Sequence, residues 1–265
     1  MKHGKYKIPA VICAFKVVVG VGGNLNPGLI LICEMEPSYR KNCVVIDDDF
    51  PGYSEKCFNL ASKYEQYIES IIVPNGMIKD RLERMSIDIL ETFELLNATA
   101  INLLCVLKGG FKFASDLSEK IHNTAVTRSK NIPIFMDFIV SNTYENDVVG
   151  HEPQFHTYTN LTSFKDKDVL IVEDLLDSGT TLSSLVPYIK SFEPRSVLVA
   201  CLLVKRRQDF SEFQPDFVGF EVPNRFIVGY AIDYNDFFRD IPHICSINDE
   251  AKKIFAISKS DKYAK

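Results

Sequence analysis

The feature that most limits how this chain can fold is a series of four short apolar runs, each nearly free of charged residues. Each run is followed by a loop and then by a helix-like pattern, so that candidate strands and helices alternate. Near-continuous apolar strands are typical of a parallel sheet that helices cover on both faces. An α/β domain is therefore predicted, with central strands at residues 100–107, 132–139, 169–172 and 197–204.

Further segments complete the predicted order of elements. Apolar residues at steps of three and four predict a long amphipathic helix after residues 74–76, and the spacing in residues 64–73 predicts another helix. Short apolar runs predict strands at residues 43–46, 217–222 and 226–232, and the polar stretch of residues 143–162 predicts a long loop or lid.

Charge and composition exclude several classes of protein. The 265 residues carry 30 Lys and Arg against 35 Asp and Glu, a net charge of −5, so the chain lacks the basic balance that coating nucleic acid requires. Lys16, Asn24 and Pro27 divide the apolar N-terminal stretch into pieces that are each shorter than the ~20 apolar residues of a membrane span. The seven cysteines show no CxxC spacing, which indicates reduced thiols. A cytoplasmic protein that binds neither nucleic acid nor membrane is expected.

The most informative segment is residues 169–181, VLIVEDLLDSGTT, in which an apolar strand leads into a tight turn and then a helix. Open α/β sheets bind ligands at the carboxyl ends of their strands. At that end, a helix N-terminus can hold a phosphate through backbone N–H groups and hydroxyls, here those of Ser178, Gly179, Thr180 and Thr181. The segment therefore predicts a phosphate site that needs no lysine.

Carboxylates beside this turn complete a site for a ribose 5-phosphate. Glu173 and Asp174 are acceptors suited to the vicinal hydroxyls of a ribose, and Asp177 could accept a proton. An isolated Asp-Ser-Gly turn is also an ordinary helix N-cap, in which Asp177 or Ser178 would hold free N–H groups. The acidic pair at the end of an apolar strand favours the binding site.

The segment closely resembles the phosphoribosyl diphosphate motif of the type I phosphoribosyltransferases. Other segments resemble their hypoxanthine-guanine branch, in the same order and at similar spacing: PNGMIKDR (74–81), CVLKGGFK (105–112), LLVKR (202–206), PDFVGFEVPNRFIVGYA (215–231) and DYNDFFRD (233–240). The resemblance covers residues 43–250 and implies a parallel sheet flanked by helices, with a small hood subdomain. Residues 1–42 are expected to form a poorly ordered N-terminal extension and residues 251–265 a C-terminal tail.

The resemblance implies a purine site. Lys205, a cation at the end of an apolar strand, would donate to the 6-oxo oxygen of hypoxanthine or guanine and repel the amino group of adenine. The ring of Phe226, beside Arg225, would stack on the purine, and the backbone of Ile227 would bond its edge. Without the resemblance, Lys205 could be a surface lysine and Phe226 a core aromatic.

A diphosphate site is implied at two further places. Lys108 and Gly109 follow an apolar run, where glycine lets backbone amides approach a ligand, and an unusual peptide bond is implied between Leu107 and Lys108. Arg239 would hold the departing diphosphate through its planar guanidinium.

Mg²⁺ is the implied cofactor, because its preference for oxygen ligands suits a carboxylate beside a diphosphate. Asp233 is the first candidate ligand, and Glu173 and Asp174 are further candidates. All three lie in segments that carry the resemblance.

The predicted lid departs from the family pattern. Thr143 keeps a hydroxyl and Tyr144 an aromatic ring where the family has a Ser-Tyr pair, but the basic residues before that pair are absent. Thr180 also stands where a lysine is common. Less positive charge stabilises a diphosphate leaving group less well. The alternative is therefore a low-activity homologue that binds purine nucleotide and acts as a binding or regulatory module.

The expected reaction is a purine salvage step. The 5-phosphoribosyl group of phosphoribosyl diphosphate would pass to N9 of hypoxanthine or guanine and give IMP or GMP plus diphosphate, with Asp177 assisting proton movement. A homodimer or homotetramer is expected.

Overall fold

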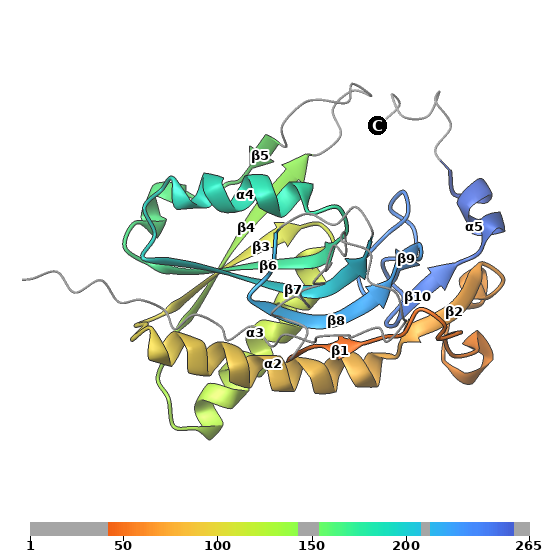
Figure 1. The fold of residues 1–265 in the computed structure, drawn as a ribbon, viewed down its shortest axis with the longest axis horizontal. Coiled ribbons are helices and arrows are strands. Elements are labelled where there is room, and N and C mark those ends of the chain that lie inside the picture. The colour runs from red at the N-terminus through yellow and green to blue at the C-terminus, as the bar shows by residue number, and fades with distance from the viewer. Residues whose placement is uncertain (1–41, 143–153, 208–212, 257–265) are drawn as a thin grey trace, which may run out of the picture.

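Seven strands form the central sheet, in the order β1-β8-β7-β6-β3-β4-β5 (Figure 1). The computed structural model describes residues 42–142, 154–207 and 213–256. All neighbouring strands of this sheet are parallel except the edge pair β4 and β5, which is antiparallel. The strands are β1 (Val44–Val45), β3 (Ile101–Leu107), β4 (Ile134–Asn142), β5 (Gln154–His156), β6 (Asp168–Leu176), β7 (Ser196–Arg206) and β8 (Phe217–Pro223).

Helices cover both faces of this sheet, as the apolar runs predict. α2 (Asn75–Leu95) and α3 (Gly110–Thr127) lie on one face and α4 (Thr180–Lys190) on the other (Figure 1). The predicted amphipathic helix is α2, and Ile78, Leu82, Met85 and Phe93 on its apolar face are buried in the core between α2, α3 and the sheet. The residues of β3 are almost wholly buried because both faces are covered. The predicted α/β fold is confirmed.

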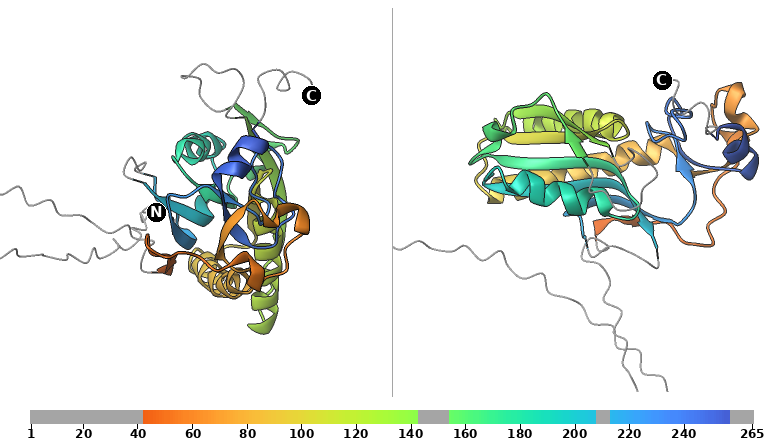
Figure 2. Two further views of the ribbon diagram at one scale, coloured as in Figure 1. Left: turned by 90° about the vertical axis from the view of Figure 1, so that its right-hand side faces the viewer. Right: turned by 90° about the horizontal axis from the view of Figure 1, so that it is seen from above.

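A second, smaller sheet forms the hood, in the order β2-β10-β9. β2 (Ile68–Val73) pairs antiparallel with β10 (Ile244–Ile247), which pairs antiparallel with β9 (Ile227–Val228). The short helices η2 (Glu55–Cys57), α1 (Ser62–Glu65) and α5 (Asp249–Ile254) complete this end of the molecule (Figure 2). Residues from both ends of the described chain therefore build the hood around an apolar cluster of its own.

Three predictions about the elements need correction. The helix expected over residues 64–73 is wrong: α1 ends at Glu65, and Ile68–Val73 is strand β2, which its β-branched residues favour. The strand expected over residues 226–232 is reduced to β9, because Tyr230 and Ala231 take positive φ angles that end it. Within the expected loop of residues 143–162, strand β5 pairs with β4, and 3-10 helix η3 begins at Leu161 and ends at Phe164.

Two further predictions concern the C-terminal boundary of the domain and the membrane. Helix α5 spans the boundary expected at residue 250, and Phe255 after it packs on Phe237 and Phe238. Among the described residues, no helix is both long enough and apolar enough to cross a membrane.

Candidate active site

The carboxyl ends of four adjacent parallel strands, β3, β6, β7 and β8, place the expected site residues along one edge of the sheet. Leu107 ends β3, Leu176 ends β6, Arg206 ends β7 and Pro223 ends β8. The residues predicted to bind phosphate, ribose and purine lie in the last part of these strands or in the loops that follow them. This edge is where open α/β sheets bind ligands.

The predicted phosphate turn joins β6 to α4. Gly179 has φ 81°, a left-handed backbone that glycine adopts without strain, and α4 begins at Thr180. The hydroxyls of Ser178 and Thr180 are 2.9 Å apart, and the Thr180 N–H faces the Ser178 hydroxyl at 3.4 Å. The turn thus presents hydroxyls and the first N–H groups of an 11-residue helix, a suitable arrangement for an anion.

Asp177 lies between two cations. Lys205 Nζ donates to its Oδ2 at 3.0 Å, and Arg207 Nη1 donates to its Oδ1 at 2.8 Å. Burial raises the pKa of Asp177, but these two charged donors outweigh it and hold the pKa below its usual value. Asp177 is therefore an ionised carboxylate with one cation on each oxygen, and it faces β7 instead of capping α4.

Glu173 is buried and Asp174 is half-buried beside it near the end of β6. Burial raises the pKa of Glu173 well above its usual value, and the neighbouring Asp174 raises it further. The pKa of Asp174 is also raised by burial, although Glu173, nearby backbone N–H groups and Arg239 oppose that shift. Among the described residues, Glu173 Oε2 has no hydrogen-bond partner. A buried acceptor without a donor suits a ligand hydroxyl.

The turn between β3 and α3 touches this acidic pair. The peptide bond between Leu107 and Lys108 is cis, as the resemblance implied. A Cβ on Gly109 would lie 2.0 Å from Asp174 Oδ2, so this position admits no side chain unless Asp174 moves. Glycine here lets the turn approach the acidic pair.

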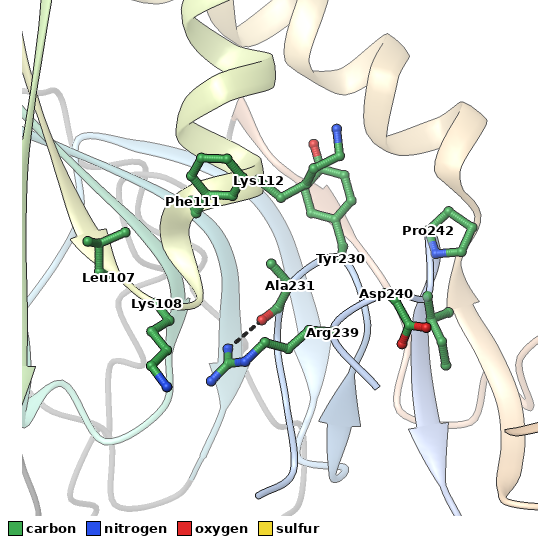
Figure 3. Close-up of a pocket in the computed structure, with 10 residues that line it drawn as sticks. Leu107, Lys108, Phe111, Lys112, Tyr230, Ala231, Arg239, Asp240 and Pro242 are labelled. Carbon is green, nitrogen blue, oxygen red and sulfur yellow. Dashed lines mark hydrogen bonds between the residues drawn. The ribbon is translucent and has the colours of Figure 1, made fainter. Parts of the chain in front are cut away.

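Two cations expected to hold diphosphate meet at one acidic side chain. Lys108 Nζ lies 3.3 Å and Arg239 Nη2 3.1 Å from Asp236 Oδ1, and Arg239 also pairs with Asp233 at 2.8 Å. Arg239 Nη1 donates to the Ala231 carbonyl at 2.7 Å (Figure 3). Lys108, Ala231 and Arg239 line a pocket of about 620 Å³ between the start of α3 and the segment of residues 230–242.

The expected purine contacts follow β8. Phe226 is 40% exposed, and its ring packs edge-to-face with that of Tyr234, with ring centroids 5.0 Å apart. Ile227 is in β9, paired with Ser246. The guanidinium of Arg225 donates to the carbonyls of Asp48 and Phe50, at 3.3 and 2.7 Å, and so contacts the backbone of the loop that follows β1.

The carboxylates expected to bind Mg²⁺ form no cluster of three among the described residues. Mg²⁺ usually takes one or two protein carboxylates and completes its shell with water and substrate phosphates. Asp233 is 28% exposed beside Arg239, and the unpartnered Glu173 oxygen is a hard donor, so the donor set fits an ion that arrives with a phosphorylated ligand.

Sequence reasoning missed Arg207 and Asp236, because side-chain pairing across a sheet edge is not visible in a motif. The only signal was the basic run of residues 205–207 at the end of an apolar strand. Thr143 and Tyr144, the expected lid residues, lie outside the described residues.

Comparison with known proteins identifies the family. The sequence model of the phosphoribosyl transferase domain matches residues 70–235. A hypoxanthine-guanine phosphoribosyltransferase of Schistosoma mansoni is 43% identical over 97% of this chain and 93% of its own length, a match that includes part of residues 1–42. A human phosphoribosyltransferase domain-containing protein 1 is 40% identical over 84% of this chain and 98% of its own length.

A solved structure supports the same assignment. The crystal structure of the Schistosoma mansoni enzyme in complex with IMP superposes with a TM-score of 0.70 and is 45% identical. The superposition covers 81% of this chain and 99% of that one. The chain belongs to the hypoxanthine-guanine phosphoribosyltransferase family.

Proposed function

We propose that this protein transfers the 5-phosphoribosyl group of phosphoribosyl diphosphate to N9 of hypoxanthine or guanine, giving IMP or GMP and diphosphate. The observation that carries the proposal is the ion pair of Asp177 with Lys205. It places a candidate proton acceptor and a candidate reader of the purine 6-oxo group 3.0 Å apart, next to the phosphate turn.

The phosphate turn and the acidic pair would hold the sugar. Residues 178–181 would bind the 5-phosphate through their hydroxyls and N–H groups. Glu173 and Asp174 would accept hydrogen bonds from the ribose hydroxyls, which fits the unpartnered Glu173 oxygen. C1 of the ribose would then lie between the diphosphate contacts and the purine.

The purine would lie against Phe226, whose exposed side chain can stack on it, with the backbone of Ile227 at its edge. Arg225 would hold the loop after β1 beside it. Lys205 would turn from Asp177 to the 6-oxo oxygen, because an ammonium can only donate. Asp177 Oδ2, released by Lys205, would accept the proton from the imidazole ring of the purine as the bond from C1 to nitrogen forms.

Diphosphate would leave toward Lys108, Gly109 and Arg239. Both cations are in reach of Asp236, so they are already held at one place before a ligand arrives. Asp233, with Glu173 or Asp174, would hold Mg²⁺, which supplies charge neutralisation on the departing diphosphate. Thr143 and Tyr144 would close over it.

Substitution of the proton acceptor tests the proposal. Asp177→Asn keeps the shape of the side chain but removes the acceptor, so turnover should fall by about 10²–10⁴, the usual value of general acid–base assistance. Diphosphate release would be followed with hypoxanthine, guanine, xanthine and adenine, with and without Mg²⁺. Affinity for GMP should change much less, because the contacts to its phosphate and ribose remain.

The same assay decides between the enzyme and a binding module. The missing positive charge of the lid favours the alternative of a homologue that binds purine nucleotide but turns over little. If the wild-type protein binds GMP tightly yet turns over no faster than Asp177→Asn, the enzyme proposal is wrong. If turnover needs both Asp177 and Mg²⁺, the binding module is excluded.

A further inference from the structure

Arg207 is a second cation on the proposed proton acceptor, and neither the motifs nor the family resemblance draw attention to it. Its Nη1 donates to Asp177 Oδ1 at 2.8 Å, while Lys205 takes Oδ2. The side chain of Arg207 is 27% exposed and that of Asp177 41%. The contact is therefore partly shielded from water, where an ion pair is worth more than on an open surface.

The end of β7 explains why residues 205 and 207 both reach Asp177. Successive side chains of a strand point to opposite faces, so Lys205 and Arg207 share one side and Arg206 takes the other. Arg206 accordingly pairs with Glu221 at 2.7 Å and with Asp48 at 2.5 Å, away from Asp177. Two of the three consecutive basic residues thus converge on one carboxylate.

The proposed reaction gives these two cations different tasks. A bound 6-oxopurine would offer Lys205 a second acceptor, and reaching it would move the ammonium from its present geometry on Asp177 Oδ2. We propose that Arg207 is a positioning residue that keeps Oδ1 of Asp177 fixed while Lys205 turns to the purine, so that Oδ2 faces the proton it accepts. This inference rests on the proposed function.

Electrostatics agrees with this division of tasks. Lys205 and Arg207 both lower the pKa of Asp177 against the opposing effect of burial. When Lys205 leaves for the purine, one of these two influences is weakened and Asp177 becomes a better proton acceptor. Arg207 still prevents a free carboxylate from rotating.

The test compares Arg207→Gln with Arg207→Lys. Gln cannot supply a charge, so we expect kcat to fall about tenfold, less than the ~10²–10⁴ of the whole general base, with little change in KM for hypoxanthine. Lys restores the charge and should recover most of kcat. The matched control is Arg84→Gln, which removes an exposed ion pair with Asp88 on α2 and should leave kcat unchanged.

A second measurement needs no turnover. In protein labelled with ¹³C at the Asp carboxyl carbons, the signal lost in Asp177→Asn identifies Asp177, and its titration midpoint should move to higher pH in Arg207→Gln. Equal midpoints in wild type and Arg207→Gln, or a kcat loss that Lys does not recover, would overturn the positioning role. If the midpoint moves but wild type does not turn over, the ion pair stands and the proposed function fails.

Discussion

Replacing Lys205 tests whether this residue selects the purine. Lys205→Met keeps the buried aliphatic stem and removes the ammonium, so the core around β7 should stay packed. The Lys205 side chain is 10% exposed, and water can replace it poorly. A hydrogen bond to a charged group is worth ~1.5–3 kcal/mol, so the Kd for a 6-oxopurine should rise about 10- to 150-fold.

Equilibrium binding is the right assay, because Lys205→Met also removes one cation from Asp177 and will alter kcat for that reason alone. Calorimetry with hypoxanthine, guanine and phosphoribosyl diphosphate would give each Kd separately. Affinity for phosphoribosyl diphosphate should stay within about twofold of wild type, since residues 178–181 are untouched. Lys190→Met, an exposed change at the end of α4, is the control. Equal weakening of all three ligands would refute the reasoning and make Lys205 structural.

Three other changes have defined outcomes. Gly109→Ala puts a Cβ 2.0 Å from Asp174 Oδ2, so GMP affinity and melting temperature should both fall, because overpacking lowers the free energy of unfolding by ~1–3 kcal/mol. Burial lowers the pKa of His243, whose Nδ1 accepts the N–H of Asn75. As pH falls below about 6.5, His243 of the unfolded chain is protonated first, which lowers the free energy of unfolding, so the urea midpoint should drop more in wild type than in His243→Asn. Deletion of residues 1–40 should leave melting temperature and turnover nearly unchanged, because no periodic pattern ties them to the core.

Each of these predictions has a contrary result. Normal GMP binding by Gly109→Ala would mean that Asp174 does not contact the nucleotide. The same urea profile in wild type and His243→Asn would assign the pH dependence to other groups. A large fall in melting temperature on deletion of the N-terminal segment would show that it packs on the domain.

The central sheet could be predicted because its strands are buried on both faces, and a strand buried on both faces is apolar at nearly every position. The residues of β3, β6 and β7 read as apolar runs, and those of α2 show helical spacing. The phosphate turn could also be predicted, because its strand, turn and helix are contiguous in residues 169–181.

The hood and the ion pairs of the site could not be predicted from local sequence patterns. Residues 64–73 mix a single helical turn with a strand, and their apolar spacing fits a helix as well as it fits that mixture. The ion pair of Lys108 with Asp236 joins residues that are 128 positions apart. The ion pair of Asp177 with Arg207 depends on how β6 and β7 align in the sheet. Such contacts follow from tertiary packing, which local patterns do not encode.

The pairing of β2 with β10 has a consequence for how the protein is made. Ser70 and Ser246 are partners in this small sheet, with their hydroxyls 2.9 Å apart, although 176 positions separate them. A ribosome delivers β2 before the central strands β3 to β8 and β10 after them, so the hood can close only when the intervening residues have been made. Contacts over such distances also slow folding. Chains that stop before residue 244 would therefore contain the phosphate turn but lack β10, the strand that joins β2 to β9 and so to Ile227.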